Sequence, residues 1–312
     1  MKKTITITIA ALLLAACTDS EKQLRERAAV LCQYIPDHEL LGQSKDYLTE
    51  DFYAVLDTMF YHLPEHEAMD HEWLYYFVTG NGGTIADYTI VGVEQIDKTH
   101  AVATISVRQR WEDGSFDETT DIEEHKLYME KVNGEWLMSD FDLHKADCIN
   151  YIANNRKEQA LRDAISDYLV REIGSHYEQG ELCIPVLMMV AADEVDSTTG
   201  RVWGDFWVMW YTPSGDTLRC VSGGNHSGLM SLEVTDGKYT VTSFEQTADG
   251  AGWEPSARRI FGSYYDVFQN MHSNHDLQEA VRREQLRYYL KRHNLPYRYY
   301  QDYGWPAVEI EN

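Results

Sequence analysis

The residue with the most suggestive chemical setting in this sequence is an aspartate between two tryptophans. Asp205 alternates with Trp203 and Trp207 along an apolar segment, so the three side chains share one face of an extended strand. Burial between two indole rings would raise the pKa of the carboxyl group toward neutrality, as a general base requires. The alternative is a structural aspartate that is neutralised by an arginine such as Arg201 or Arg219. We expect the structural alternative, in which the pKa of Asp205 falls.

A second group of polar side chains lies in the glycine-rich segment from Ser222 to Gly228. Its glycines could form a nest of backbone N–H groups, and His226 could then act as a base or as a ligand. The segment lacks the spacing of a phosphate-binding loop or a nucleophile elbow, so we interpret it as a glycine-rich turn with a polar tip. The candidate ligand-binding residues are Trp203, Asp205, Trp207, Asn225 and His226, of which Asp205 and His226 are also the catalytic candidates.

Side chains of the types that bind metal ions gather at His62, His66, Asp70 and His71. Their spacing matches no strong metal-binding motif, and we interpret the segment as a solvated loop. The sequence therefore predicts no metal site, and nothing in it indicates another cofactor.

The N-terminus carries the most specific motif of the chain. Lys2 and Lys3 form a positively charged start, and Ile5 to Leu14 form an apolar core that is too short for a membrane-spanning helix. Leu14-Ala15-Ala16-Cys17 follows, with small residues at a cleavage site and a thiol directly after them. This arrangement closely resembles a bacterial lipoprotein signal with its lipobox. A plain secretory leader with a coincidental cysteine is the alternative.

The resemblance implies that Cys17 becomes the acylated first residue of the mature protein. Several acyl chains would give stable anchoring to a membrane that the protein does not span. The expected location is the bacterial cell envelope. Thr18 follows the cysteine where an inner-membrane retention signal has an aspartate, which favours the outer membrane, although Asp19 stands one place further on.

The composition limits the possible partners. The chain of 312 residues is long enough for roughly two domains, and 44% of its residues are apolar, enough for packed cores. The formal net charge is −24, and no basic stripe offsets it. Such a surface repels phosphate backbones, so we expect no nucleic-acid partner and interpret the acidity as favouring solubility.

Four cysteines remain beyond Cys17, namely Cys32, Cys148, Cys183 and Cys220. An oxidising compartment permits disulfides among them. Pairing Cys32 with Cys148 and Cys183 with Cys220 would place one disulfide in each half of the chain. The alternative is a set of buried thiols, and it is the one we favour because no CxxC or other metal-binding spacing occurs.

One stretch of sequence occurs twice and indicates an internal duplication. Glu130–Asp142 reads EKVNGEWLMSDFD, and Glu233–Glu245 reads EVTDGKYTVTSFE. Asn133-Gly134 aligns with Asp236-Gly237, and both dipeptides predict type I′ turns with positive φ at the two central residues. Each copy is therefore expected to form a tight hairpin in one of two related modules.

The other elements follow from helical and strand periodicities. We expect helices over 18–34, 44–60 and 63–78, strands over 88–96 and 101–108, and then the first hairpin. Residues 143–155 are expected to form a polar connector. A helix over 157–176 and strands over 183–195, 201–212, 218–221 and 229–234 lead to the second hairpin. Apolar residues on both faces of 201–212 predict a central strand that is covered on both sides.

After the second hairpin the pattern is helical again, over 260–268 and 276–293. The tail from Pro296 to Pro306 is rich in tyrosine and contains Trp305. Such an aromatic tail is unlike a disordered segment, and we expect it to pack across the second sheet or the domain junction.

The order of helices followed by a four-stranded meander resembles that of the NTF2-like (cystatin-like) superfamily, and in particular of its Bacteroidetes lipoproteins. The segments YLTEDFYAVLD and NGEWLMSDFD contribute to this likeness. The likeness covers residues 44–145 and, more weakly, the second module. It implies an α+β fold of two tandem cone-shaped modules, each with helices packed on a curved antiparallel sheet, plus a C-terminal helical extension. The implied domains are a signal peptide over 1–16, an N-terminal helix and tether over 17–43, NTF2-like domains over 44–155 and 156–254, and C-terminal helices with an aromatic tail over 255–312.

These observations favour a lipid-anchored, non-enzymatic envelope protein that binds a small molecule or an envelope partner. NTF2-like cones sometimes house isomerases and dehydratases that use a carboxylate or a histidine in an apolar pocket, so an enzyme with Asp205 as its base is the first alternative. The second alternative is a glycan-binding module that uses the aromatic side chains of the second half, for which core packing is the competing interpretation.

Overall fold

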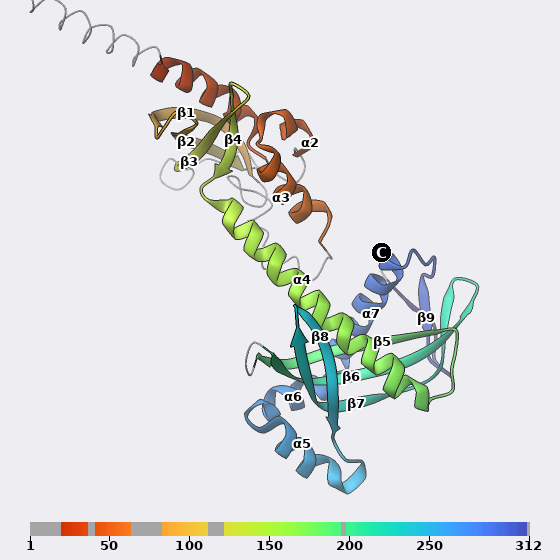
Figure 1. The fold of residues 1–312 in the computed structure, drawn as a ribbon. Coiled ribbons are helices and arrows are strands. Elements are labelled where there is room, and N and C mark those ends of the chain that lie inside the picture. The colour runs from red at the N-terminus through yellow and green to blue at the C-terminus, as the bar shows by residue number, and fades with distance from the viewer. Residues whose placement is uncertain (1–19, 37–40, 64–82, 112–121, 195–197, 311–312) are drawn as a thin grey trace, which may run out of the picture. The chain divides into compact units, whose positions relative to one another are not determined.

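The computed structural model describes residues 20–36, 41–63, 83–111, 122–194 and 198–310 (Figure 1). The chain divides into two compact units, Met1–Arg156 and Lys157–Asn312, which are described separately below. The leader with Cys17, the predicted helix over 63–78 beyond its first residue, and His66, Asp70 and His71 lie outside the described residues. In the part of the chain that is described, no helix has the length and apolar character needed to cross a membrane.

The first unit packs helices against a four-stranded antiparallel meander with the strand order β1-β2-β3-β4 (Figure 1). Its helical segments are a helix over 20–31, η1 Cys32–Tyr34, α2 Leu41–Ser44, η2 Lys45–Tyr47 and α3 Glu50–Tyr61. Its strands are β1 Gly83–Gln95, β2 His100–Trp111, β3 Ile122–Val132 and β4 Glu135–Phe141. Acidic Glu50 and Asp51 occupy the first turn of α3, where the positive end of the helix dipole favours them.

The core of the first unit lies between α3, the helix over 20–31 and one face of the sheet. Phe52, Leu56 and Met59 recur at helical spacing along α3 and are buried. They belong to one apolar cluster with the alternate residues of β2, namely Ala101, Ala103, Ile105 and Val107. The period-two pattern that predicts this strand is therefore confirmed.

The second unit is built on a longer sheet. Its helices are the C-terminal part of α4 His144–Tyr168, a π-helical turn over Leu169–Ile173, η5 Gly174–His176, η6 Gly250–Gly252, α5 Trp253–Phe261, η7 Gly262–Tyr264, α6 Tyr265–His272 and α7 His275–Arg292. Its strands are β5 Leu182–Glu194, β6 Thr199–Ser214, β7 Thr217–Thr235, β8 Lys238–Gln246, β9 Tyr299–Gln301 and β10 Val308–Glu309. Strands β5 to β8 repeat the antiparallel meander of the first unit.

Helix α4 begins earlier than the sequence analysis predicts. Residues 144–155, expected to form a connector, are helical. Cys148, Ile152 and Asn155 are buried at spacings of four and three residues, so this stretch has an inward-facing stripe. Their polar neighbours obscure that stripe in the sequence.

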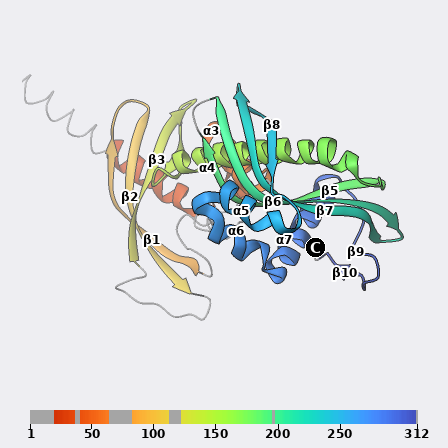
Figure 2. The same cartoon turned by 90° about the horizontal axis from the view of Figure 1, so that it is seen from below.

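Both faces of the second sheet are covered, as Figure 2 shows for α4 on one side and α5 to α7 on the other. Val202, Phe206 and Val208 of β6 form a cluster with residues of α4 and the π-helical turn. Residues on the other face of β6, such as Trp203 and Met209, lie in clusters with residues of α5, α6 and α7. The predicted central strand is confirmed, and the C-terminal helices have a clear physical role, because they bury the second apolar face of this sheet.

The two hairpins agree residue by residue. Asn133, Gly134, Asp236 and Gly237 all have positive φ, between 51° and 92°, as type I′ turns require. Met129 pairs with Met138 and Leu232 pairs with Val241, each just before a register shift. The aligned residues Ser139 and Thr242 are the extra residues at these shifts, so the two hairpins share a bulge as well as a turn. The predicted turns are confirmed, and the common bulge strengthens the case for duplication.

The aromatic tail extends the sheet of the second unit. Strand β9 pairs in parallel with β7, and β10 pairs with β9. Tyr300 is buried, and it contacts the guanidinium of buried Arg282 at 4.4 Å from its ring centroid. Tyr303 and Trp305, in contrast, are exposed. The prediction that the tail packs on the sheet holds for the first of these aromatic residues and is wrong for the other two.

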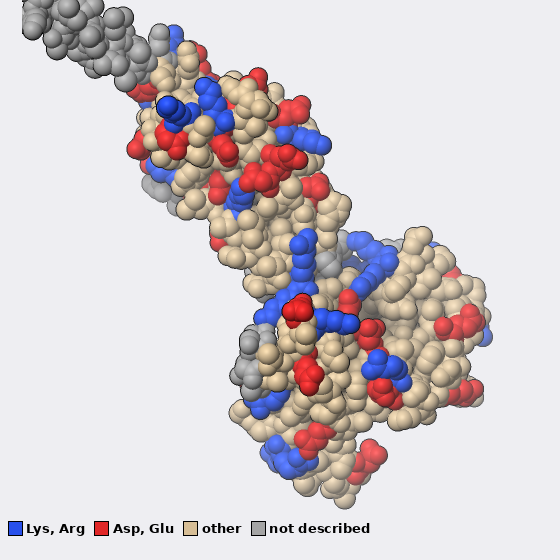
Figure 3. Space-filling model, in the orientation of Figure 1, with Lys and Arg blue, Asp and Glu red and all other residues tan. Residues whose placement is uncertain are grey.

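The remaining cysteines are free thiols. Burial raises the pKa of Cys32 and Cys148 to about 12, and that of Cys183 and Cys220 to about 11. On the molecular face drawn in Figure 3, acidic and basic side chains are interspersed over the surface of each unit. The fold class inferred from the sequence is confirmed: α+β, with helices packed on antiparallel sheets and a helical region near the C-terminus.

Candidate functional site

The carboxylate of Asp205 lies at the centre of a polar cluster on the face of the second sheet that α5, α6 and α7 cover. Asp205 has no exposed surface. Its Oδ1 accepts hydrogen bonds from Asn225 Nδ2 at 2.6 Å and from Ser227 Oγ at 2.7 Å. Its Oδ2 lies 2.9 Å from Nδ1 of His272. A buried carboxylate is thus satisfied by side chains on both of its oxygens.

The strand register and one helical turn bring these side chains together. Asp205 pairs with Ser227 in the ladder between β6 and β7, and Trp207 pairs with Asn225, so their side chains share one face. His272 is the last residue of α6, four residues after the buried Phe268. Its ring also stacks on Trp253, with 5.1 Å between ring centroids. The histidine is therefore held from the sheet side by Asp205 and laterally by Trp253.

The partner of Asp205 is a histidine and not one of the arginines considered in the sequence analysis. Arg201 donates to Asp193 at 2.6 Å, and its guanidinium lies over the ring of Trp203. The sequence does not identify His272 as the partner of Asp205, because His272 lies 67 residues away along the chain. The only available signal was the spacing of Phe268 and His272 on one helical face.

The two tryptophans beside Asp205 differ in their burial. Trp203 is buried, and its Nε1 donates to the carbonyl oxygen of Ile260 at 2.8 Å. Trp207 is half-buried, and its Nε1 is a buried donor for which the described residues provide no acceptor. Core packing is therefore the interpretation that the structure favours for Trp203.

The glycine-rich segment from Ser222 to Gly228 is part of the extended strand β7, and the predicted turn is wrong. Its glycines permit close packing. A Cβ at Gly224 would lie 2.2 Å from the hydroxyl of Tyr177, and one at Gly228 would lie 2.1 Å from the carbonyl oxygen of Glu245. His226 is separated from Asp205 because strand alternation directs it to the other face, where its ring bonds to Tyr177 and Gln246 at 2.8 and 2.7 Å.

The electrostatics of the cluster centre on His272. The hydrogen bond to Asp205 raises the pKa of His272, and this effect outweighs partial burial, which lowers it. About 29% of the His272 side chain is exposed, whereas Asp205 is fully enclosed. With Nδ1 held by Asp205, the other ring nitrogen, Nε2, is available to donate a hydrogen bond or exchange a proton. The cluster can thus bind a hydrogen-bonding ligand or supply one acid–base group.

The first unit has a second histidine–aspartate pair, which was not predicted from the sequence. Nδ1 of His125 lies 2.6 Å from Oδ2 of Asp142. Oδ1 of the same aspartate accepts from the backbone N–H of Lys126 at 2.5 Å. Asp142 and the following Leu143 both have positive φ, of 49° and 65°, an unusual conformation for residues other than glycine. The hydrogen bonds of Asp142 with His125 and Lys126 fasten the end of β4 to β3.

The environment of this pair is more closed than that of His272. His125 is 6% exposed, and its Nε2 is buried without a hydrogen-bond partner among the described residues. Hydrogen bonds from His125 and Lys126 lower the pKa of Asp142 despite its partial burial, which acts in the opposite direction. At the aligned positions the second module has Gly228 and Glu245, so it does not repeat the pair.

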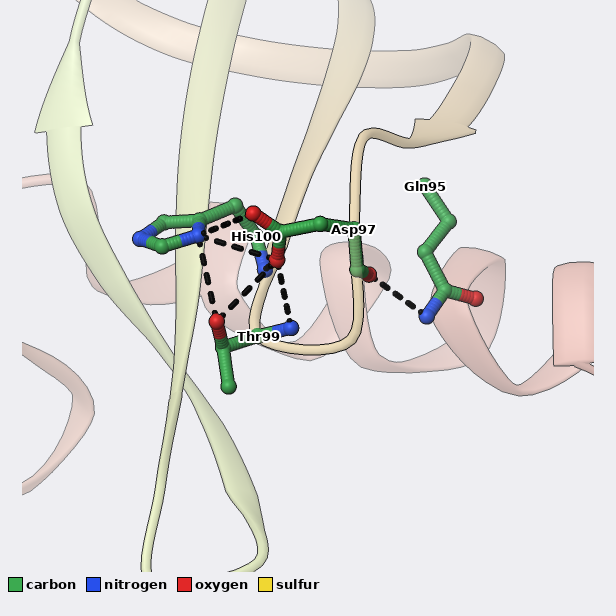
Figure 4. Close-up of polar contacts among 4 residues, drawn as sticks. All are labelled: Gln95, Asp97, Thr99 and His100. Atoms are coloured by element: carbon green, nitrogen blue, oxygen red, sulfur yellow. Dashed lines mark hydrogen bonds and ion pairs between the residues drawn. The ribbon is translucent and has the colours of Figure 1, made fainter.

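Another dense set of polar contacts surrounds Asp97 in the turn between β1 and β2, which Figure 4 shows. Oδ1 of Asp97 accepts from the backbone N–H groups of Thr99 and His100 at 2.7 and 2.8 Å. These bonds, together with the ring of His100, hold the pKa of Asp97 well below its usual range. All partners lie within three residues of Asp97 and are exposed, so the network stabilises the turn between β1 and β2.

Metal-binding chemistry has no cluster to support it in the part of the chain that is described. There, no group of three or more histidine, cysteine, aspartate or glutamate side chains is arranged to hold a metal ion. His62, the one described member of the cluster considered in the sequence analysis, is exposed and lies 3.1 Å from Asp57.

Comparison with known proteins does not assign the chain to a family. No family model matches the sequence. No curated protein matches it either. One similar solved structure is described as an "Ntf2 like protein involved in plasmid conjugation"; it is 9% identical, has a TM-score of 0.23, and the match covers 74% of this chain and 98% of that chain. A likeness at this TM-score supports no conclusion about function.

Proposed function

We propose that this protein is a lipid-anchored, non-enzymatic protein of the bacterial cell envelope, built from two NTF2-like modules, whose second module binds a small molecule or an envelope partner at His272. The observation that carries the binding role is the contrast between an enclosed Asp205 and a partly exposed His272. A carboxylate with no exposed surface cannot meet a substrate directly. Asp205 instead fixes the orientation of the imidazole that does reach the surface.

The lipobox-like sequence before Cys17 supports the anchor. An acylated Cys17 would tether the protein to a membrane, and the folded units would then work at its surface. The order of helices and meander in each unit, and the identical turn and bulge of the two hairpins, support two related modules of the NTF2-like type.

The chemistry of His272 defines the class of ligand. Its raised pKa favours the protonated ring, in which Nδ1 donates to Asp205 and Nε2 remains a donor. A ligand with a carboxylate, phosphate or carbonyl oxygen would accept that hydrogen bond. The neighbouring ring of Trp253 would provide an apolar contact for the rest of the ligand.

An acid–base enzyme is the second candidate, and the same pair favours it. A histidine oriented by a buried aspartate is an arrangement that general acid–base catalysis uses. In this alternative the proton-exchanging group is His272, and Asp205 is a positioning residue. The isomerase or dehydratase hypothesis with Asp205 as the base is less compatible with an enclosed carboxylate that has a partner on each oxygen.

Native mass spectrometry of the full chain purified from bacterial envelopes tests the binding role. We expect wild-type protein to carry a small molecule or partner that the His272→Phe variant has lost. His275→Phe is the matched control, because His275 lies three residues further on and is exposed. If both variants retain the same bound species as wild type, His272 is not the binding residue. If wild type carries nothing beyond its acyl groups, a tightly bound ligand is excluded.

A further inference from the structure

An uncharged aromatic segment lies between β9 and the start of β10, and it is called the tip below. The segment Tyr303-Gly-Trp-Pro-Ala-Val308 contains no charged residue in a chain of which 25% is charged. Tyr303 is 96% exposed, Trp305 71% and Val308 37%. Large aromatic side chains that gather on an exposed segment mark an interaction surface more often than isolated ones do.

Hydrogen bonds hold the tip in a tight turn. The backbone N–H of Trp305 donates to the carbonyl oxygen of Asp302 at 3.1 Å, and Gly304 has a φ of 79° that suits a tight turn. Gln301 Nε2 donates to the carbonyl oxygen of Trp305 at 2.9 Å. The base of the turn is held by Arg282, which is 3% exposed and donates to both carboxylate oxygens of Asp302 at 2.7 Å.

The charges that flank the tip are neutralised locally. Asp302 at one end is paired with Arg282, and Glu309 at the other end is paired with Arg298 at 3.2 Å. Both carboxylates beside the tip therefore have a positively charged partner, which lowers the cost of bringing them close to a membrane surface. Two backbone groups of the turn are also satisfied internally, which lowers the cost of moving it out of water.

We propose that this tip enters the headgroup region of a lipid bilayer and fixes the second unit against the membrane surface. Tryptophan and tyrosine prefer that region because each combines an apolar ring with a polar group. Pro306, Ala307 and Val308 add apolar surface but no side-chain hydrogen-bonding group, which suits lipid better than the hydroxyl-rich surface of a glycan. The proposal rests on the proposed membrane anchor at Cys17, and its test is kept separate from the test of that anchor.

The test uses the full chain reconstituted in phosphatidylcholine vesicles, with and without bromine atoms on the acyl chains. Bromine quenches tryptophan fluorescence only at short range. We expect brominated lipid to quench the emission component that is present in wild type and absent from Trp305→Phe. A reporter tryptophan placed elsewhere, in a Val267→Trp/Trp305→Phe variant, is the control, because Val267 is 50% exposed on α6 of the same unit. We expect its emission to be unaffected by bromine.

The proposal is overturned if the Trp305 component is not quenched, or if the reporter at position 267 is quenched to the same extent. A change of Trp305 emission on adding soluble peptidoglycan fragments, without quenching by brominated lipid, would indicate a glycan site instead. The intact mass of the same sample shows whether Cys17 is acylated. If it is not, the assay is repeated with unacylated protein at high lipid concentration, where quenching of the Trp305 component alone decides.

Discussion

The Asp205 carboxylate can be buried because the side chains around it satisfy its hydrogen-bonding groups. Asn225, Ser227 and His272 place donors on its two oxygens, and the histidine can supply a compensating positive charge. Loss of any one of these side chains would leave a buried polar atom of its partner without a hydrogen bond. The cluster therefore stabilises the fold only while all its members are present. Asp205 and His272 therefore belong to one polar cluster.

Removal of the Asp205 carboxylate should destabilise the second unit. We expect Asp205→Ala to lower the free energy of unfolding by roughly 1–3 kcal/mol, since its donors lose their acceptor inside the protein. Thermal melts beside wild type would measure this loss. Asp193→Ala is the control, because Asp193 and its partner Arg201 are each more than 40% exposed and such pairs contribute about 0–1 kcal/mol. A higher melting temperature for Asp205→Ala would instead favour a strained, functional carboxylate.

The contribution of His272 should depend on pH. Its pKa in the folded protein is raised, so protonation stabilises the fold fully below the pKa of the unfolded chain, about 6.5. That stabilisation is lost as the pH rises through the higher folded pKa. Urea denaturation at pH 5.5 and 8.5 should therefore show a larger difference between wild type and His272→Gln at the lower pH. A difference that is constant or grows with pH would show that the pair is not linked to protonation in this way.

At the scale of elements, the two hairpins depend on glycine because of their backbone conformation alone. Gly134 and Gly237 have φ of 92° and 73°, and a Cβ at either position would meet no atom within 4 Å. Gly134→Val and Gly237→Val should each cost roughly 1–3 kcal/mol of stability. Gly92→Val in β1 is the control, because Gly92 is equally uncrowded and lacks positive φ. Equal melting temperatures for all three variants and wild type would contradict the type I′ assignment.

Local signals in the sequence predicted most elements, and non-local contacts explain the exceptions. The dipeptides Asn133-Gly134 and Asp236-Gly237 specify their turns by themselves, so the hairpins were predictable. The segment around Gly224 read as a turn because glycine is common there, whereas these glycines serve close packing against Tyr177 and Glu245. His272 could not be assigned to Asp205 from sequence, since the contact depends on how α6 packs on the sheet.

At the scale of the whole molecule, the second module differs from the first in what covers its sheet. Trp203, Met209 and Tyr211 give β6 a second apolar face, and α5 to α7 bury it. The corresponding face of β2 carries Thr104, Ser106 and Arg108. The added helices create the interface in which Asp205 and His272 meet, so the candidate site is a consequence of this extension and not of the meander that the two modules share.

Acylation at Cys17 is the modification that would bring the protein to a membrane. The direct measurement is the intact mass of the protein recovered from the membrane fraction, compared with that of the Cys17→Ala variant. We predict that wild type starts at Cys17, carries the mass of several acyl chains and sediments with membranes, whereas Cys17→Ala is released or retains its leader. A wild-type protein that is soluble and unacylated would contradict the lipid anchor and the envelope function built on it.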